Sequence, residues 1–410
     1  MGGRSGRNNG RSAISLEEAR TVLCNAAVPM DFASCSLKSS LGRIIAEDLT
    51  AALNQPPFRR SAMDGYALRS EDIRLASPET PVTLAVRGCM YAGDEPLKSG
   101  YLKNGEAVRI MTGAAVPDDA DLVIRQEETD EGEKTVRIYS NGGSRSNISP
   151  IGEDFASGEC LIEKGTLIDA YALSCASAAG YTFLPVRRKI RVGLIVTGNE
   201  LCPPGQTLLP GKIYNSNEAF LEGRLTQLGC ELADSVYAED RREKITDAIV
   251  RLKSEADLII TTGGVSVGER DLVPEALKAA GAEILFHGIA IKPGMPTLGA
   301  VFGGIPLLGL SGNPYSAASV FELLGRPLCF KMLCRRDEPF MKAAAQLDGD
   351  VVQNSDVPRV LRGTYDGRKV HVQERQRNAR MKTGVGTNCM LILPAGKAVY
   401  RAGEAVEILL

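Results

Sequence analysis

The stretch Ile190-Arg-Val-Gly-Leu-Ile-Val-Thr-Gly-Asn-Glu200 decides the fold of the central part of the chain. A nearly continuous apolar run that ends in a glycine-bearing turn is typical of a strand buried on both faces of a parallel sheet. Two later stretches repeat this arrangement, Asp257-Leu-Ile-Ile-Thr-Thr-Gly-Gly264 and Ile305-Pro-Leu-Leu-Gly-Leu-Ser-Gly-Asn-Pro314. Helices are expected over 216–228, 241–254, 272–280 and 315–324. The alternation predicts βαβ units and a mostly parallel sheet.

On both sides of this region the pattern changes to short alternating segments, which are typical of strands exposed on one face. Such strands are expected over 82–86, 106–110, 121–124 and 135–138, and again over 357–361, 369–372, 390–393 and 405–410. Helices are expected over 15–26, where Ser15 can act as N-cap, and over 170–179.

These patterns predict a multidomain protein of the α/β plus β class, because 410 residues exceed what one compact core usually holds. The predicted divisions are a disordered tail over 1–12, a discontinuous N-terminal helical and linker domain over 13–50 and 145–185, a small β-rich domain over 51–144, an α/β domain over 186–330, and a C-terminal β-barrel-like domain over 335–410.

The composition argues against several classes of function. Lys and Arg (48) balance Asp and Glu (50), and aromatic residues make up only 5%, so no nucleic-acid surface is expected. No run of 18 apolar residues occurs, so no membrane span is expected. The ten cysteines form no C-x-x-C pair, which favours reduced thiols in a cytoplasmic protein. With only two histidines, a His-rich zinc site or a Ser-His-Asp triad is not expected, and His287 and His371 are interpreted as strand residues.

A ligand site is predicted beyond the carboxyl ends of the central strands, where loops run into helix N-termini. Gly198, Gly263, Gly264 and Gly312 all stand there. Free backbone N–H groups and the positive ends of helix dipoles attract phosphate at such turns. A single glycine turn often serves geometry alone, but three in one sheet favour a phosphate-bearing ligand.

Of four side chains near these turns, Asp271, Glu200 and Lys292 have two interpretations each. Asp271 is either the N-cap of the next helix or an oxygen ligand of Mg²⁺ that bridges phosphates. Glu200 either caps its loop or holds a metal or a nucleotide hydroxyl. Lys292 is either solvated or neutralises an oxyanion, and Ser266 offers a hydrogen-bond donor. The glycine spacing around Ser266 fits neither a Walker A loop nor the dinucleotide fingerprint.

Several motifs taken together resemble the molybdopterin molybdenumtransferase family, which includes bacterial MoeA and the E-domain of gephyrin. The most specific are Ser61-Ala-Met-Asp-Gly-Tyr-Ala67 and Thr262-Gly-Gly-Val-Ser-Val-Gly-Glu-Arg-Asp271. The other matching stretches are Arg109-Ile-Met-Thr-Gly-Ala114, Gly152-Glu-Asp154, Thr197-Gly-Asn-Glu200, Asn215-Ser-Asn217, Lys292-Pro-Gly294 and Gly312-Asn-Pro314. They run in family order from about residue 13 to 330, and the C-terminal domain fits by position and strand content.

The resemblance implies a MogA-like α/β domain that binds molybdopterin and nucleotide. The family's reaction takes adenylylated molybdopterin and molybdate, with tungstate as an alternative, and cleaves the phosphoanhydride. It releases molybdenum cofactor and AMP, and it uses Mg²⁺ or a similar ion. The resemblance also implies a homodimer with shared active sites. A MogA-type adenylyltransferase and molybdoenzyme apoproteins are candidate partners.

The resemblance further assigns residues to roles. Implied catalytic positions are Asp271, Ser266, Glu200, Lys292, Asp64, Thr112 and Asp154. Implied binding positions are Gly198, Asp240, Gly263, Gly264, Gly268, Gly312 and Asn313, and Asp271 and Glu200 are the implied metal ligands. Asp64 and Thr112 are expected to act in trans, because the family's small domain reaches across the partner's pocket. From the residues alone, Asp64-Gly65 reads as a simple turn.

Two positions depart from the family pattern. Met295 stands where many members carry a second lysine, and Ser149-Pro-Ile precedes Gly152 where many bacterial members carry arginine. Both changes remove cations, for which Arg362 is a candidate replacement. Two alternatives therefore stay open. One is a catalytically reduced paralogue that acts as a molybdopterin-binding or scaffold protein. The other is a nucleotide hydrolase or adenylyltransferase built on the same α/β domain.

Overall fold

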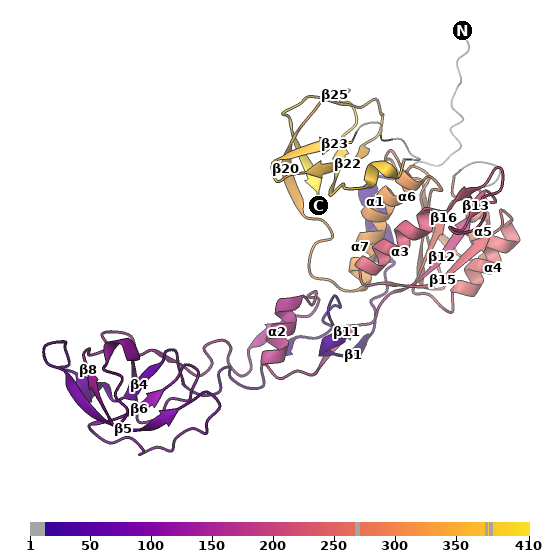
Figure 1. The fold of residues 1–410 in the computed structure, drawn as a ribbon. Helices are drawn as coiled ribbons and strands as arrows, with labels where there is room; N and C mark the ends of the chain where they lie inside the picture. The colour runs from indigo at the N-terminus through magenta and orange to yellow at the C-terminus, as the bar shows by residue number, and fades with distance from the viewer. Residues whose placement is uncertain (1–12, 267–270, 374–375, 377–379) are drawn as a thin grey trace, which may run out of the picture.

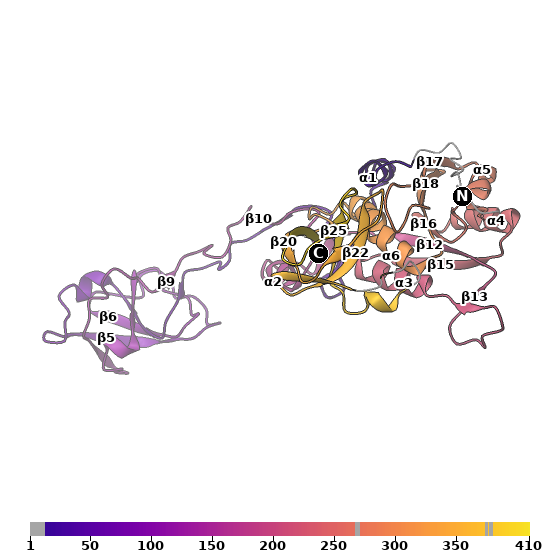
Figure 2. The same ribbon diagram turned by 90° about the horizontal axis from the view of Figure 1, so that it is seen from above.

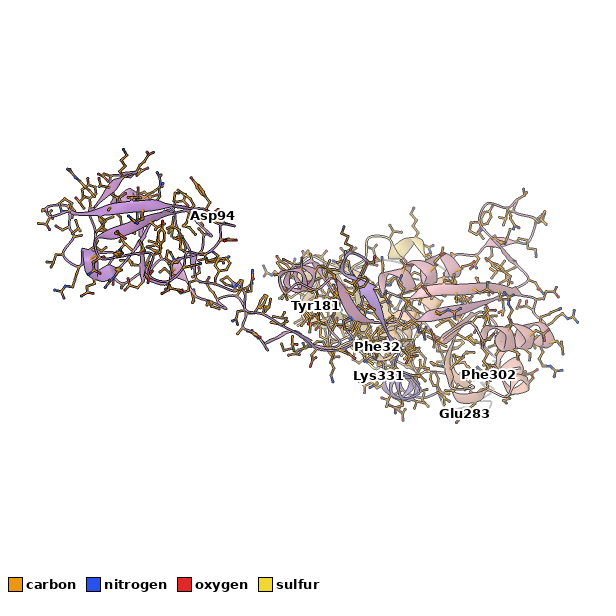
Figure 3. The ribbon with its side chains drawn as sticks, turned by 90° about the horizontal axis from the view of Figure 1, so that it is seen from below. Phe32, Asp94, Tyr181, Glu283, Phe302 and Lys331 are labelled. Carbon is orange, nitrogen blue, oxygen red and sulfur yellow. The ribbon has the colours of Figure 1, made fainter. Side chains whose placement is uncertain are left out.

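The computed structural model describes residues 13–266, 271–373, 376 and 380–410. The molecule is elongated, with a small β-rich unit at one end and an α/β unit with an adjoining β-barrel at the other (Figure 1, Figure 2). A narrow linker unit joins the two ends. Figure 3 shows the separation between Asp94 in the small unit and Phe302 in the α/β unit.

The α/β unit is built on a six-stranded sheet with strand order β15-β12-β16-β19-β18-β17. The pairs β15–β12, β12–β16 and β16–β19 are parallel, as predicted, and β18 is antiparallel to both of its neighbours. The strands are β12 (Arg191–Thr197), β15 (Glu231–Ala238), β16 (Leu258–Thr262), β17 (Glu283–His287), β18 (Leu298–Phe302) and β19 (Ile305–Leu310), with a separate short pair of β13 (Leu201–Cys202) and β14 (Ile213–Tyr214).

Helices cover both faces of this sheet, which explains why its strands are apolar on both sides. On one face, Ile249 of α4 and Leu277 of α5 share an apolar cluster with Ile259 of β16. On the other face, Leu225 of α3 and Leu328 of α7 pack with Ile260 of β16. The helices are α3 (Asn217–Gln227), α4 (Arg242–Leu252), α5 (Val273–Ala280), α6 (Pro314–Val320) and α7 (Arg326–Met332).

The helix expected over 315–324 is longer and is interrupted. A π-turn, η4 (Phe321–Gly325), lies between α6 and α7. Pro327 explains it, because proline has no N–H to donate and its ring clashes with the carbonyl one turn earlier. The regular α-helical hydrogen-bond pattern is therefore interrupted at Pro327, and the wider π-turn accommodates the missing hydrogen bond and the proline ring.

The linker unit consists of two short two-stranded sheets and helix α2 (Figure 1). Its elements are β1 (Phe32–Ser36), η1 (Leu37–Ser39), β2 (Leu49–Thr50), β10 (Cys160–Ile162), α2 (Ala170–Ala178) and β11 (Phe183–Arg187). Helix α1 (Leu16–Asn25) begins with a capping box formed by Ser15 and Glu18. Ala19 and Leu23 of α1 pack in the same cluster as Leu328 of α7, so this helix adds to the α/β unit.

The small unit contains a five-stranded sheet with order β7-β4-β6-β5-β8. Its elements are β3 (Arg60–Ser61), β4 (Gly65–Leu68), η2 (Ser70–Ile73), β5 (Val82–Met90), β6 (Glu106–Ile110), β7 (Leu122–Arg125), η3 (Gln126–Glu128), β8 (Thr135–Ile138) and β9 (Ile148–Ser149). The four strands predicted over 82–138 are present, but β4 was not predicted. Gly65 is required in it, because a Cβ there would lie 1.9 Å from the carbonyl oxygen of Ile124 on the adjacent strand.

The C-terminal unit is a closed barrel with strand order β20-β23-β22-β24-β26, which confirms the predicted barrel-like domain. Its elements are β20 (Lys342–Leu347), β21 (Val351–Val352), β22 (Arg359–Tyr365), β23 (Lys369–Val372), η5 (Lys382–Gly384), β24 (Cys389–Leu393), β25 (Val399–Tyr400) and β26 (Ala405–Leu409). His371 lies in β23 and His287 ends β17, so both histidines are strand residues as expected.

Candidate functional site

The three glycine-bearing turns lie together, because β12, β16 and β19 are adjacent in the sheet and end at the same edge. Gly198 follows β12, Gly263 and Gly264 follow β16, and Gly312 follows β19. All four glycines line one cleft of about 630 Å³, here called the strand-end cleft. The sequence prediction of a site at the carboxyl ends of the strands thus corresponds to a real concavity of a size typical for small-molecule ligands.

Gly263 holds the three turns in close contact. Its N–H donates to the carbonyl of Leu310 at 2.9 Å, and its φ is +87°. A Cβ at this position would lie 2.7 Å from the carbonyl oxygen of Thr197. Only glycine fits such a left-handed backbone in so little space. The close approach packs the turns that follow β12, β16 and β19 against one another at the edge of the sheet.

Among the described residues, three carboxylates line the strand-end cleft: Glu200, Asp240 and Asp271. Asp240 is oriented by a reciprocal pair of hydrogen bonds. The N–H of Asn199 donates to Asp240 Oδ2 at 3.1 Å, and the N–H of Asp240 donates to Asn199 Oδ1 at 3.3 Å. Within the described ranges, no group of three His, Cys, Asp or Glu side chains is close enough to hold a metal by itself. Mg²⁺ sites commonly use one or two carboxylates and complete their coordination with substrate phosphates and water, so this donor set fits Mg²⁺.

Residues with hydroxyl groups, including Thr262 and Ser266, also line the cleft. The Oγ1 of Thr262 is buried and has no hydrogen-bond partner, although Thr262 is only 1% exposed. A buried hydroxyl without a partner is unfavourable unless a ligand or water satisfies it. Half-buried Ser266 lines the same cleft. Gly268 lies outside the described residues.

The sequence reasoning missed the role of Asn215 in building the site. Its Oδ1 accepts hydrogen bonds from the N–H groups of Asn217 and Glu218 at 3.1 and 3.3 Å, which caps the start of α3. Asn217 Nδ2 in turn donates to the carbonyl of Gly312 at 3.0 Å. The positive end of α3 is thereby fixed beside the turn that follows β19. The signal was present, because Asn-Ser-Asn before a helix is a capping sequence.

Lys292 does not line the strand-end cleft. It lies in a second cleft of about 640 Å³ between the α/β unit and the barrel, here called the basic cleft, with Arg359 from β22. Asn313 lines both clefts. The backbone of Lys292 joins the two units, because its N–H donates to Pro358 and its carbonyl accepts from Val360, both at 2.9 Å.

The remaining predicted residues lie far from both clefts. Asp64 and Thr112 are in the small unit, where Asp64 Oδ1 accepts hydrogen bonds at 2.7 Å from both the hydroxyl and the N–H of Thr112. These bonds lower the pKa of Asp64. Asp154 is exposed near the junction of the small unit and the linker unit. At this separation these residues cannot reach the strand-end cleft of their own chain (Figure 1).

Comparison with known proteins adds to this geometry. Two family models match the chain, the MoeA N-terminal region (domain I and II) over 14–180 and the probable molybdopterin binding domain over 193–331. The molybdopterin molybdenumtransferase of Staphylococcus epidermidis is 34% identical over 404 residues, which cover 98% of this chain and 96% of that protein. The chain belongs to the molybdopterin molybdenumtransferase family. The protein of that name from Staphylococcus aureus is likewise 34% identical, over 405 residues.

Solved structures agree with this family. A MoeA protein from Pyrococcus horikoshii superposes with a TM-score of 0.83 at 31% identity, over 97% of this chain and 99% of that one. A second structure from the same organism gives a TM-score of 0.84 at 27% identity, over 97% and 100%. The predicted family, the transferase class and the role in molybdenum cofactor biosynthesis are therefore confirmed. None of the helices in the described ranges is both long and apolar enough to cross a membrane.

Proposed function

We propose that this member of the molybdopterin molybdenumtransferase family cleaves the phosphoanhydride of adenylylated molybdopterin and inserts molybdate, releasing AMP and molybdenum cofactor. The observation that carries the proposal is the convergence of three glycine turns and three carboxylates on the strand-end cleft. Backbone donors suit the phosphates, and the carboxylates suit a divalent cation. We include in the proposal a MogA-like character of the α/β unit, which the match of 193–331 to the molybdopterin binding domain supports.

In this proposal, different groups of the strand-end cleft bind the phosphates and the metal ion. Backbone N–H groups around Gly198, Gly263 and Gly312 hold the phosphates, and Ser266 donates a further hydrogen bond. Asp271 and Glu200 hold Mg²⁺, which when bound neutralises the charge that develops on the phosphate oxygens. Asn313 lines both the strand-end cleft and the basic cleft, and so is the residue that would contact both ligands.

The basic cleft is the proposed site of molybdate, or of tungstate. Lys292 and Arg359 supply the positive charge that an oxyanion requires. Met295, which stands where many family members have a lysine, is 47% exposed and brings no charge. Arg359 from the barrel therefore substitutes for part of the missing charge. Arg362 does not fill this role, because its guanidinium lies 3.9 Å from the centroid of the Tyr315 ring and lines another cavity.

A homodimer with shared sites is part of the proposal. Large apolar side chains on the linker unit are exposed, including Phe183 (61%), Tyr171 (86%) and Phe32 (59%), the last of which is labelled in Figure 3. Exposed apolar groups of this size favour burial against a second copy. The small unit of that copy would then bring its Asp64, Thr112 and Asp154 to the strand-end cleft. Candidate further partners are a MogA-type adenylyltransferase and molybdoenzyme apoproteins. A cytoplasmic location is supported by the ten cysteines, all of which are free thiols.

The test is AMP release from adenylylated molybdopterin by the purified protein with Mg²⁺, with and without molybdate. Molybdate-dependent AMP release with formation of molybdenum cofactor is the expected result. Tight binding of the substrate without AMP release would contradict it. That outcome would favour the molybdopterin-binding or scaffold paralogue, for which the uncharged Met295 is the specific observation, and Met295→Lys would then be tested for recovery of activity.

A further inference from the structure

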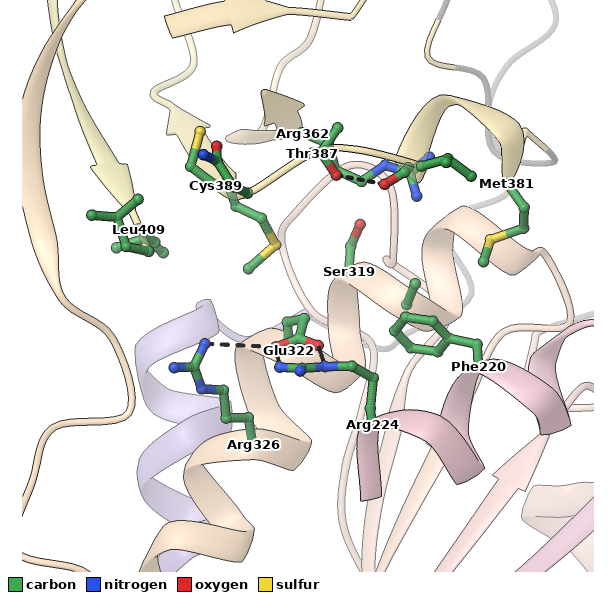
Figure 4. Close-up of a pocket in the computed structure, with 16 residues that line it drawn as sticks. Phe220, Arg224, Ser319, Glu322, Arg326, Arg362, Met381, Thr387, Cys389 and Leu409 are labelled. Atoms are coloured by element: carbon green, nitrogen blue, oxygen red, sulfur yellow. Dashed lines mark hydrogen bonds and ion pairs between the residues drawn. The ribbon is translucent and has the colours of Figure 1, made fainter. Parts of the chain in front are cut away.

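A third cavity, of about 500 Å³, lies between the helices of the α/β unit and the barrel and is separate from the strand-end cleft. It is here called the arginine cavity. One wall carries Arg224, Ser319, Glu322 and Arg326 from α3, α6, η4 and α7, and the opposite wall comes from the barrel (Figure 4). The cavity shares no lining residue with the strand-end cleft or the basic cleft.

The charge of the arginine cavity is positive. Arg224 forms a two-pronged ion pair with Glu322, with N–O distances of 2.5 and 2.9 Å, and Arg326 lies 3.8 Å from the same carboxylate. Arg362 is a third guanidinium on the wall, and among the described residues only Glu322 contributes a carboxylate side chain to the cavity. Even a terminal carboxylate at Leu410, which also lines the cavity, would leave one positive charge in excess.

Polar atoms on the wall lack partners within the described part of the chain. They are Ser319 Oγ, Arg326 Nε and Arg362 Nε, and Ser319 and Arg362 are only 2% and 8% exposed. Figure 4 shows the Ser319 hydroxyl pointing into the space between the helices and the barrel. Burial lowers the pKa of both the Arg326 and the Arg362 guanidinium. A buried positive charge with unsatisfied donors is stabilised by an anion that accepts those hydrogen bonds.

Two further features indicate a binding site rather than a packing defect. Glu322 lies in the π-turn η4 that Pro327 imposes, and π-turns are frequent at functional sites. Much of the remaining wall is apolar, with Phe220 on one side and Met390 and Leu409 on the other, and Thr387 and Asn388 add polar groups to it. The volume of the arginine cavity, about 500 Å³, lies within the range of small-molecule pockets. The cavity therefore combines an anion-binding end with an apolar remainder.

We propose that the arginine cavity binds a small amphipathic carboxylate, with its head group at Ser319 and the arginines and its apolar body against Phe220, Met390 and Leu409. A single negative charge matches the small excess of positive charge, and the planar guanidinium matches a carboxylate. The proposal adds a second small-molecule site to the chain, and it does not depend on the function proposed above.

The experiment is calorimetric titration of the full chain with octanoate and with 1-octanol, in the absence of any pterin. Octanoate is expected to bind at least about tenfold more tightly than 1-octanol, because only the carboxylate accepts charge-assisted hydrogen bonds. Ser319→Ala should weaken octanoate binding about tenfold. It should leave the stability of the protein unchanged or slightly higher, because the hydroxyl it removes has no partner.

Ser316→Ala is the matched control, because its hydroxyl is equally buried and without a partner on the same helix but does not line the cavity. It should leave octanoate binding unchanged. Arg326→Met is the second variant and should also weaken octanoate binding. Equal affinity for octanoate and 1-octanol, or octanoate binding that neither Ser319→Ala nor Arg326→Met changes, would overturn the proposal. Absence of octanoate binding to the intact protein would also overturn it.

Discussion

At the scale of single residues, Asp271 is the side chain whose proposed role is the most specific. It lines the strand-end cleft at the start of α5. If it holds Mg²⁺, Asp271→Asn should lower the rate of AMP release at least about a hundredfold and change the substrate Kd much less. Both quantities are measured, AMP release by single turnover and Kd by calorimetry. Asp247→Asn, an exposed change of the same charge on α4, is the control. Equal losses in rate and in affinity would contradict the metal-ligand role.

Gly263 carries a prediction about stability rather than chemistry. Gly263→Ala should destabilise the protein by about 3 kcal/mol, because it combines backbone strain with a contact of 2.7 Å to the Thr197 carbonyl oxygen. Gly304→Ala is the matched control, because Gly304 has nearly the same φ (+86°) but nothing within 4 Å of the added Cβ. The control should cost only about 1 kcal/mol. Urea unfolding measures the free energy of unfolding of both variants. Equal losses of that free energy would show that the surrounding structure shifts and removes the close contact at Gly263.

The sequence predicted the residues of the strand-end cleft better than those of the other two cavities. Gly198, Gly263 and Gly312 were predictable because each follows a strand whose apolar run is unmistakable. Lys292 was expected beside them, but the structure places it in the basic cleft with Arg359. The barrel contributes that arginine, and contacts between units so distant in sequence leave no local pattern. For the same reason, the arginine cavity has no sequence signature.

At the scale of elements, the link between the linker unit and the central sheet depends on Asp257. Its carboxylate accepts hydrogen bonds from Arg188 at 2.8 and 2.9 Å and from the N–H of Arg191 at 2.8 Å. Burial acts to raise the pKa of Asp257, but the hydrogen bonds from Arg188 and Arg191 outweigh it, and the net result is a lowered pKa. The ionised carboxylate therefore ties the end of the linker unit to the start of β12.

The sign of the pH effect follows from this lowered pKa. The stabilisation is complete above the ordinary carboxyl value and is lost as the pH falls through the lower folded-state value. Asp257→Asn should cost about 1 kcal/mol at pH 7, since solvent screens part of the pair, and less near pH 3. Urea unfolding at the two pH values tests this. Asp234→Asn, which breaks the more exposed pair with Arg251, should cost about half as much or less.

Helices and strands were predictable where the hydrophobic pattern runs over many residues, and they were missed where it covers only a few. Helices α3, α4 and α5 lie within two residues of their predicted bounds, whereas the helix expected over 315–324 continues through η4 and α7 to Met332. β4 and β20 were missed because Gly65 and the alanines over 343–345 show no contrast between buried and exposed positions. β18 was missed because it joins β19 through Gly303-Gly304 as a hairpin, which breaks the βαβ alternation.

At the scale of the whole molecule, the shared site of the proposed dimer is the main expectation. An Asp64→Ala chain and an Asp271→Ala chain should each be inactive, since each removes one part of every site. Mixed chains should recover up to about a quarter of the wild-type AMP release, because random pairing gives half heterodimers with one intact site each. Activity is measured after mixing under conditions in which subunits exchange. If mass spectrometry shows heterodimers and no activity returns, the sites are not shared.

The way in which the small unit is inserted into the chain allows the unit to be exchanged, in evolution or by protein engineering. Its entry and exit strands pair with each other, with Arg60 opposite Ser149 and Ser61 opposite Ile148. Its two apolar clusters draw only on residues between 66 and 148. The segment 60–149 is therefore a cassette with adjacent ends. It can be cut from the gene, transplanted, or replaced by a tight turn, while the α/β unit and the barrel keep every contact of their own.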